Sequence, residues 1–162
     1  MILAAFTLFH VVISLIGIGA GFVVMYGLLA SKRFDGWTKL FLITTAATSV
    51  TGFMFPVQHF MPSHVLGILS LIALTIAILA RYRFDLAGAW RRTYVVTAVI
   101  ALYFNVFVLI VQLFEKVPAL KAIAPTQSEA PFKMAQLAAL LIFAFLGTKA
   151  AISFRIDPPR TA

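Results

Sequence analysis

The stretch Gln58-His59-Phe60-Met61-Pro62-Ser63-His64 divides a long apolar run and thereby decides how often the chain crosses a membrane. The run around it, from Leu40 to Ala80, contains no Asp, Glu, Lys or Arg. A spanning helix needs about 20 apolar residues, so this run is too long for one span and suits two. Pro62 and Ser63 favour a helix start, with Ser63 as the N-cap. We therefore expect two helices here, one on each side of the break.

The composition of the whole chain also indicates a membrane protein. Of its 162 residues, 62% are hydrophobic and only 11% are charged, whereas soluble domains carry about 25% charged residues. The sequence therefore predicts an all-α protein, a polytopic transmembrane bundle that forms a single domain over residues 1–162. Its five spans are expected at residues 5–30, 40–58, 64–81, 93–114 and 131–154. A polar loop from Glu115 to Ala130 precedes the last span, with Ser128 as its expected cap.

The basic residues predict the orientation. Ten of them fall on one side of the expected bundle: Lys32, Arg33, Lys39, Arg81, Arg83, Arg91, Arg92, Lys149, Arg155 and Arg160. Only Lys116, Lys121 and Lys133 fall on the other. Because cytoplasmic loops are enriched in Lys and Arg, we expect an inner-membrane protein with its N-terminus outside and its C-terminus inside.

The same bias explains the net charge of +8 without a nucleic-acid partner. Basic residues next to a span attract anionic lipid head groups. We expect such lipids as partners of four arginines: Arg81, Arg83, Arg91 and Arg92.

Small and polar residues mark the expected packing faces. His10, Ser14, Gly17 and Gly21 are spaced four, three and four apart, so they share one stripe of the first helix. Small residues let helix backbones approach closely in a membrane. The stripe is therefore expected to face inward, or to associate with a second copy through Gly17 and Gly21. Asn105, in the fourth span, is expected to hydrogen-bond to a neighbouring helix.

All three histidines are expected on the outer side of the membrane. His10 lies in the outer third of the first span, His59 ends the second and His64 starts the third. A bundle can hold a b-type haem between imidazoles from facing helices, and His10 with His64 is the first pair to consider. A zinc or copper site is a second hypothesis, with His10, His59, His64 and Glu129 as ligands.

Two further interpretations of the histidines stay open. A histidine and a glutamine beside an apolar slot could hydrogen-bond the head of a quinone or lipid. Alternatively, His59 and His64 are solvated at the membrane interface, and His10 only hydrogen-bonds within the bundle. The absence of cysteine excludes thiolate ligands and covalent haem attachment.

Other function classes compete with ligand binding. The main alternative is a non-catalytic subunit or oligomeric scaffold of a membrane complex, and a transporter or channel comes third. No Asp or Glu lies inside an expected span, which counts against ion-coupled transport. The sequence identifies no catalytic residue.

The middle of the chain resembles a group of uncharacterised bacterial multi-pass membrane proteins. The shared features are a Thr-rich helix that ends in Gly52, the helix start Pro62-Ser63-His64, and the basic pair Arg91-Arg92 ahead of the next span. This resemblance implies a small histidine-bearing bundle and brings no activity with it. Cytochrome b561-type bundles are more faintly similar. They pair histidines on both sides of the membrane, and the absence of histidine from the expected cytoplasmic half excludes transfer through two stacked haems.

Overall fold

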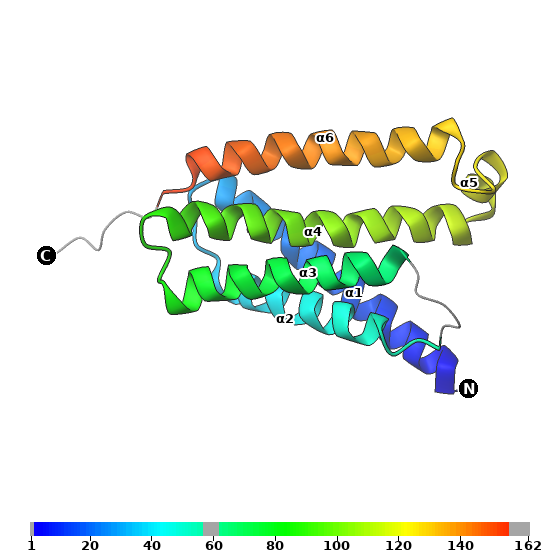
Figure 1. The fold of residues 1–162 in the computed structure, drawn as a ribbon, viewed down its shortest axis with the longest axis horizontal. Helices are drawn as coiled ribbons and strands as arrows, with labels where there is room; N and C mark the ends of the chain where they lie inside the picture. Colours follow the sequence, from blue (N-terminus) through cyan, green and yellow to red (C-terminus); the bar gives the residue numbers. More distant parts are fainter. Residues whose placement is uncertain (1, 57–61, 156–162) are drawn as a thin grey trace, which may run out of the picture.

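The protein is a bundle of long helices (Figure 1). The computed structural model describes residues 2–56 and 62–155, and within these ranges the chain forms helices and no strand. The helices are α1 (Ile2–Leu29), α2 (Asp35–Gly52), α3 (Pro62–Ile78), α4 (Ala89–Lys116), α5 (Pro118–Ile123) and α6 (Ala130–Ser153). A π-helical turn, Leu79–Arg83, continues α3. The predicted all-α class is confirmed.

Four of the described helices are long and apolar enough to cross a membrane: α1, α3 with its π-helical turn, α4 and α6. The five long helices form a ring in which α1 packs on α2, α2 on α3, α3 on α4, α4 on α6, and α6 back on α1. Figure 1 shows α3, α4 and α6 running side by side. The short α5 lies in the connection between α4 and α6, where the sequence predicted only a loop, and proline occupies its first turn.

The glycine stripe of α1 faces the inside of the ring, as predicted. A Cβ on Gly21 would lie 2.4 Å from Leu102 Cδ1 and 3.0 Å from the ring of Phe41. A Cβ on Gly17 would lie 3.0 Å from Thr44 Oγ1. Because α2 and α4 of the same chain already cover these glycines, association of two copies would have to use a different surface.

The second helix differs most from its predicted bounds. It was expected over residues 40–58, and α2 instead runs from Asp35 to Gly52. The early start is favourable because a carboxylate in the first turn interacts with the positive end of the helix dipole. With 18 residues, α2 is about 27 Å long, slightly less than the apolar thickness of a bilayer.

The two predicted serine caps have different outcomes. The cap position of α6 is occupied by Glu129 instead of Ser128. Since α3 begins at Pro62, Ser63 lies inside its first turn, and the Ser63 side chain is outside the described residues.

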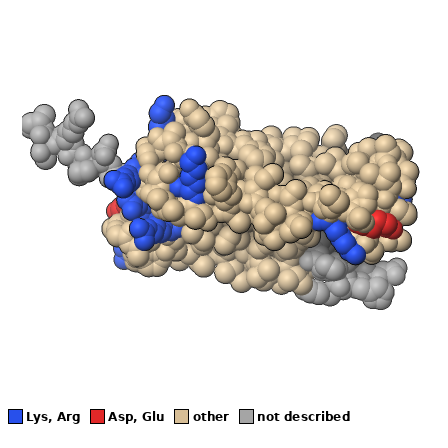
Figure 2. Space-filling view, turned by 90° about the horizontal axis from the view of Figure 1, so that it is seen from above, with Lys and Arg blue, Asp and Glu red and all other residues tan. Residues whose placement is uncertain are grey.

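Basic side chains gather at one end of the bundle, which we call the basic end. This end carries the α1–α2 and α3–α4 connections and the last turn of α6, and Figure 2 shows the concentration of Lys and Arg there. The opposite end, which carries His10, His64 and the start of α6, is called the histidine end. The charge separation along the bundle thus follows the predicted pattern, with Arg160 outside the described residues.

An ion pair that the sequence did not predict joins two helices at the basic end. The guanidinium of Arg81, whose side chain is only 3% exposed, donates to Asp35 Oδ1 at the start of α2. Its central carbon also lies 5.3 Å from the ring centroid of the buried Tyr94. Arg81, one of the four arginines expected to hold lipid, therefore binds within the protein.

Candidate functional site

His10 is held from α1 against the last turn of α2. Its Nδ1 atom lies 2.8 Å from Thr51 Oγ1, and its own backbone carbonyl accepts a hydrogen bond of 2.6 Å from the hydroxyl of Ser14. The backbone of α2 comes close to the imidazole at Gly52, where an added Cβ would make ordinary van der Waals contact, 3.8 Å from His10 Cε1. Ring and helix thus fit closely, and the imidazole has one defined polar partner.

The partner of Nδ1 bears on the tautomer of His10. The hydroxyl of Thr51 also lies 2.7 Å from the carbonyl oxygen of Ala47, which can only accept a hydrogen bond. When the hydroxyl proton is given to Ala47, Thr51 Oγ1 accepts from the Nδ1–H group of His10. A neutral imidazole that is protonated at Nδ1 carries its lone pair on Nε2. Nε2 is thus the atom that can ligate a metal or accept a hydrogen bond.

One aromatic ring contacts this imidazole, and a second ring packs on the first. Phe55 meets His10 edge-on, with ring centroids 5.1 Å apart, and Phe6 lies 5.0 Å from Phe55. An apolar wall beside one polar atom is the usual build of a small-molecule site. The sequence did not single out Thr51 or Phe55. Thr51 belongs to a Thr-rich stretch in which no single hydroxyl stands out.

His64 lies at the other side of the same turn. Its ring centroid is 5.5 Å from that of Phe53, and the residue is 9% exposed. The prediction placed His10 and His64 on neighbouring helices. In the structure α1 and α3 each pack on α2, which stands between them in the ring. The turn after α2 therefore brings both histidines to one region, through Phe55 on one side and Phe53 on the other.

The remaining members of the predicted metal set are placed differently. His59 lies outside the described residues. Glu129 belongs to the α5–α6 connection, where its carboxylate accepts hydrogen bonds from the Thr126 hydroxyl at 2.8 Å and the Ser128 amide at 3.0 Å. Within residues 2–56 and 62–155, no three His, Cys, Asp or Glu side chains gather into a group that could hold a metal ion. His10, His64 and Glu129 are therefore not gathered into one group, and the four-ligand site stays a prediction.

Polar residues on α2, α4 and α6 behave as interhelical contacts. Asn105 donates to Thr45 Oγ1 at 3.3 Å, which confirms its predicted role. Gln136 donates to the carbonyl oxygen of Phe107 at 3.2 Å. Gln127 donates to the carbonyl oxygen of Val111 at 3.1 Å and so ties the α5–α6 connection to α4.

Comparison with known proteins adds no relative. Neither a protein-family model, nor a curated protein, nor a solved structure matches the chain significantly. The resemblance to bacterial multi-pass proteins stays a prediction, and the site must be interpreted from its own chemistry.

Proposed function

We propose that the protein is a multi-pass inner-membrane protein that binds a small apolar cofactor through Nε2 of His10. In this proposal α1, α2, α3, α4 and α6 all span the bilayer, and the basic end faces the cytoplasm. The histidine end then lies at the outer surface, where a ligand can enter from the membrane or from outside.

One observation carries the proposal: the hydrogen-bond chain from His10 through Thr51 to Ala47. Metal-ligating histidines almost always donate their second ring N–H group to a partner that fixes the tautomer. Thr51 provides such a partner, and it leaves Nε2 as a lone-pair donor beside aromatic rings.

The direction of this hydrogen bond narrows the class of ligand. Nε2 accepts a hydrogen bond and does not donate one, so it suits the iron of a b-type haem or the hydroxyl of a quinol. It does not suit a quinone carbonyl, which itself needs a donor. Phe6 and Phe55 offer an apolar surface on which a flat ring could pack. We therefore propose haem b as the preferred ligand and a quinol as the alternative.

Purification of the full chain in mild detergent tests this function. We expect the wild-type protein to show a Soret band or to release a quinol on solvent extraction, as identified by mass spectrometry. His10→Ala should lose that ligand, while its circular dichroism remains that of a helical bundle. A colourless wild-type protein that releases no metal, haem or quinol would contradict the proposal. His64→Ala, in the same preparation, determines whether the second imidazole takes part.

A further inference from the structure

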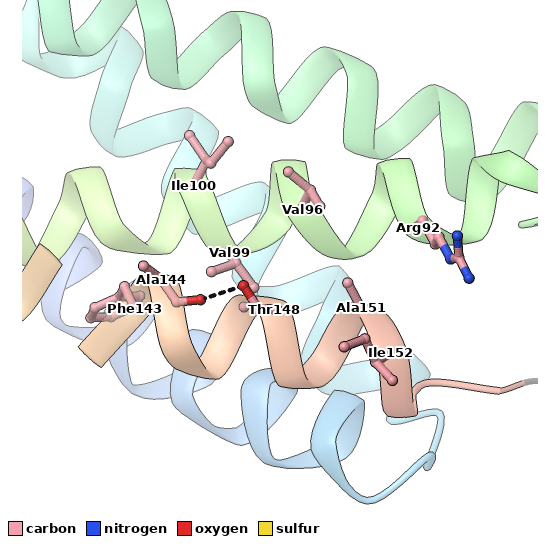
Figure 3. Close-up of a pocket in the computed structure, with 10 residues that line it drawn as sticks. Arg92, Val96, Val99, Ile100, Phe143, Ala144, Thr148, Ala151 and Ile152 are labelled. Atoms are coloured by element: carbon pink, nitrogen blue, oxygen red, sulfur yellow. Dashed lines mark hydrogen bonds between the residues drawn. The ribbon is translucent and has the colours of Figure 1, made fainter. Parts of the chain in front are cut away.

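A groove between α4 and α6 is not used by the proposed histidine site. It encloses about 500 Å³ and lies towards the basic end (Figure 3). Its walls come from two helices, with three branched residues on α4 and both small and larger residues on α6: Val96, Val99, Ile100, Phe143, Ala144, Gly147, Thr148, Ala151 and Ile152. At the buried side of the groove, a Cβ on Gly147 would lie 3.0 Å from Val99 Cγ1, so the two helices are in close contact there.

The groove opens towards the surroundings of the bundle and not towards its interior. Val96 and Ile152, at its edges, are 44% and 68% exposed. The stretch from Ala144 to Ile152 measures about 12 Å along the helix axis, at a rise of about 1.5 Å per residue. The groove is lined mainly by apolar side chains along this length and lies open beside the contact of α4 with α6. An extended hydrocarbon chain fits such a slot.

A positive charge stands at one end of the groove. Arg92 lines it next to the last turn of α6, as Figure 3 shows. Within the described residues Arg92 makes no ion pair, unlike Arg81, which is bound to Asp35. A guanidinium is well suited to phosphate because it offers several donors in a fixed plane. The groove thus combines an apolar slot with an uncompensated charge.

We propose that this groove binds one acyl chain of an anionic phospholipid, with the lipid phosphate on Arg92. Basic pockets between membrane helices on the cytoplasmic side bind anionic lipid head groups, and the proposed orientation places Arg92 on that side. The site is separate from the ligand proposed at His10, so either proposal can fail without the other. The small side chains of Ala144 and Ala151 leave room for the acyl chain, and Arg92 determines which lipid head group is preferred.

Native mass spectrometry of the full chain in neutral detergent tests the site, with phosphatidylglycerol and phosphatidylcholine of equal chain length as probes. We expect tighter binding of phosphatidylglycerol, by about fivefold, because a basic residue near a membrane surface contributes about 1 kcal/mol. Arg92→Gln should remove this preference. Lys39→Gln, at an exposed lysine of the same end, should keep it.

Filling the groove tests the acyl chain. Ala144→Leu should abolish binding of both lipids, and Thr148→Leu offers a second way to fill the slot if the first variant is poorly folded. Ala138→Leu adds the same bulk at an exposed position of α6 outside the groove and should leave binding unchanged. Equal binding of both lipids to the wild type, wild-type binding by Ala144→Leu, or binding of inorganic phosphate alone with equal affinity would overturn the proposal. So would a dimer that forms without lipid and is lost in Ala144→Leu, because a second copy would then occupy the groove.

Discussion

At the scale of single residues, Thr51 determines the chemistry available to His10. Thr51→Val keeps the shape of the side chain and removes the acceptor of the Nδ1–H group, whereas Thr51→Ser keeps the hydroxyl. Partners of this kind contribute about 10–100-fold to the affinity of a ligating histidine. We expect Thr51→Val to weaken binding of added haem by at least about tenfold and Thr51→Ser to bind normally, as measured by optical titration. Equal affinities of both variants would show that the tautomer is irrelevant.

Glu129 provides a second prediction at this scale. The hydrogen bond from the Thr126 hydroxyl holds the pKa of the Glu129 carboxyl below its ordinary value of 4.5, and the backbone amides of Thr126 and Ser128 act in the same direction. Because this pKa is lowered in the folded state, the ionised carboxylate stabilises the loop when the pH is above the ordinary pKa. This stabilisation is lost as the pH falls through the lowered pKa of the folded state. We therefore expect the Thr126 and Ser128 amides to lose protection from hydrogen exchange only below about pH 4.5.

The matched variant for this loop is Thr126→Val, which removes the hydroxyl and retains the backbone donors. Its Glu129 should titrate closer to the ordinary value in an NMR experiment, so that the loop opens at a higher pH. An unchanged titration would mean that the hydroxyl of Thr126 does not stabilise the carboxylate.

At the scale of helices, the ion pair between Arg81 and Asp35 joins the start of α2 to the π-helical turn that continues α3. Asp35→Asn leaves a buried guanidinium without its counter-charge, which costs about 1–3 kcal/mol for a group of this kind. Because the Asp35 side chain is 71% exposed, water offsets part of this loss, and we expect the lower part of that range. The melting temperature in detergent should fall. Arg33→Gln removes an exposed charge 3.7 Å from the same carboxylate and should have almost no effect.

The contact of α1 with α2 and α4 depends on Gly21. In Gly21→Ala, the new methyl group would meet Leu102 and Phe41, so the helices must separate or repack. Overpacking of this kind costs about 1–3 kcal/mol. Gly19→Ala, two residues away, meets no atom within 4 Å and should be neutral or slightly stabilising. Thermal unfolding of both variants measures the difference, and equal melting temperatures would contradict close packing at Gly21.

The sequence predicts a helix well when neighbouring residues determine it, and poorly when it depends on residues that are distant in the sequence. Long apolar runs correctly predicted α1, α3, α4 and α6, because burial of such runs outweighs any local detail. The start of α2 was missed, since Asp35 was assigned to a loop and its partner Arg81 is distant in the sequence. Likewise, α5 is too short to carry a periodic pattern, and the groove arises from residues of two helices that align only after folding.

At the scale of the whole molecule, the number of spans decides where the ends of the chain lie. Five spans place them on opposite sides of the membrane, whereas four spans without α2 place them on the same side. The chain has no cysteine, so a single introduced cysteine reports its own side without background. We expect cysteines at Ser31 and Asp85 to react only from the cytoplasm and a cysteine at Ser128 only from outside. Labelling of the cysteines at Ser31 and Asp85 from opposite sides, as four spans without α2 require, would contradict the proposed topology.

The candidate site was partly predictable at this scale. The sequence placed His10 and His64 at one end because the spans alternate in direction, and the structure brings both to the turn after α2. It could not predict that α2 stands between α1 and α3, because helix order in a bundle depends on the packing of many side chains. For the same reason, the role of Thr51 emerges only once α1 lies against α2.

The ligand content of the purified full-length protein tests the central claim most directly. Wild type and His10→Ala are prepared from the same membranes, and each is analysed by absorption spectroscopy, solvent extraction and metal analysis. The account predicts a haem or quinol in the wild-type protein and its loss from His10→Ala, with helical content and melting behaviour retained. A ligand-free wild-type protein, or a His10→Ala variant that holds as much ligand as the wild type, would contradict it.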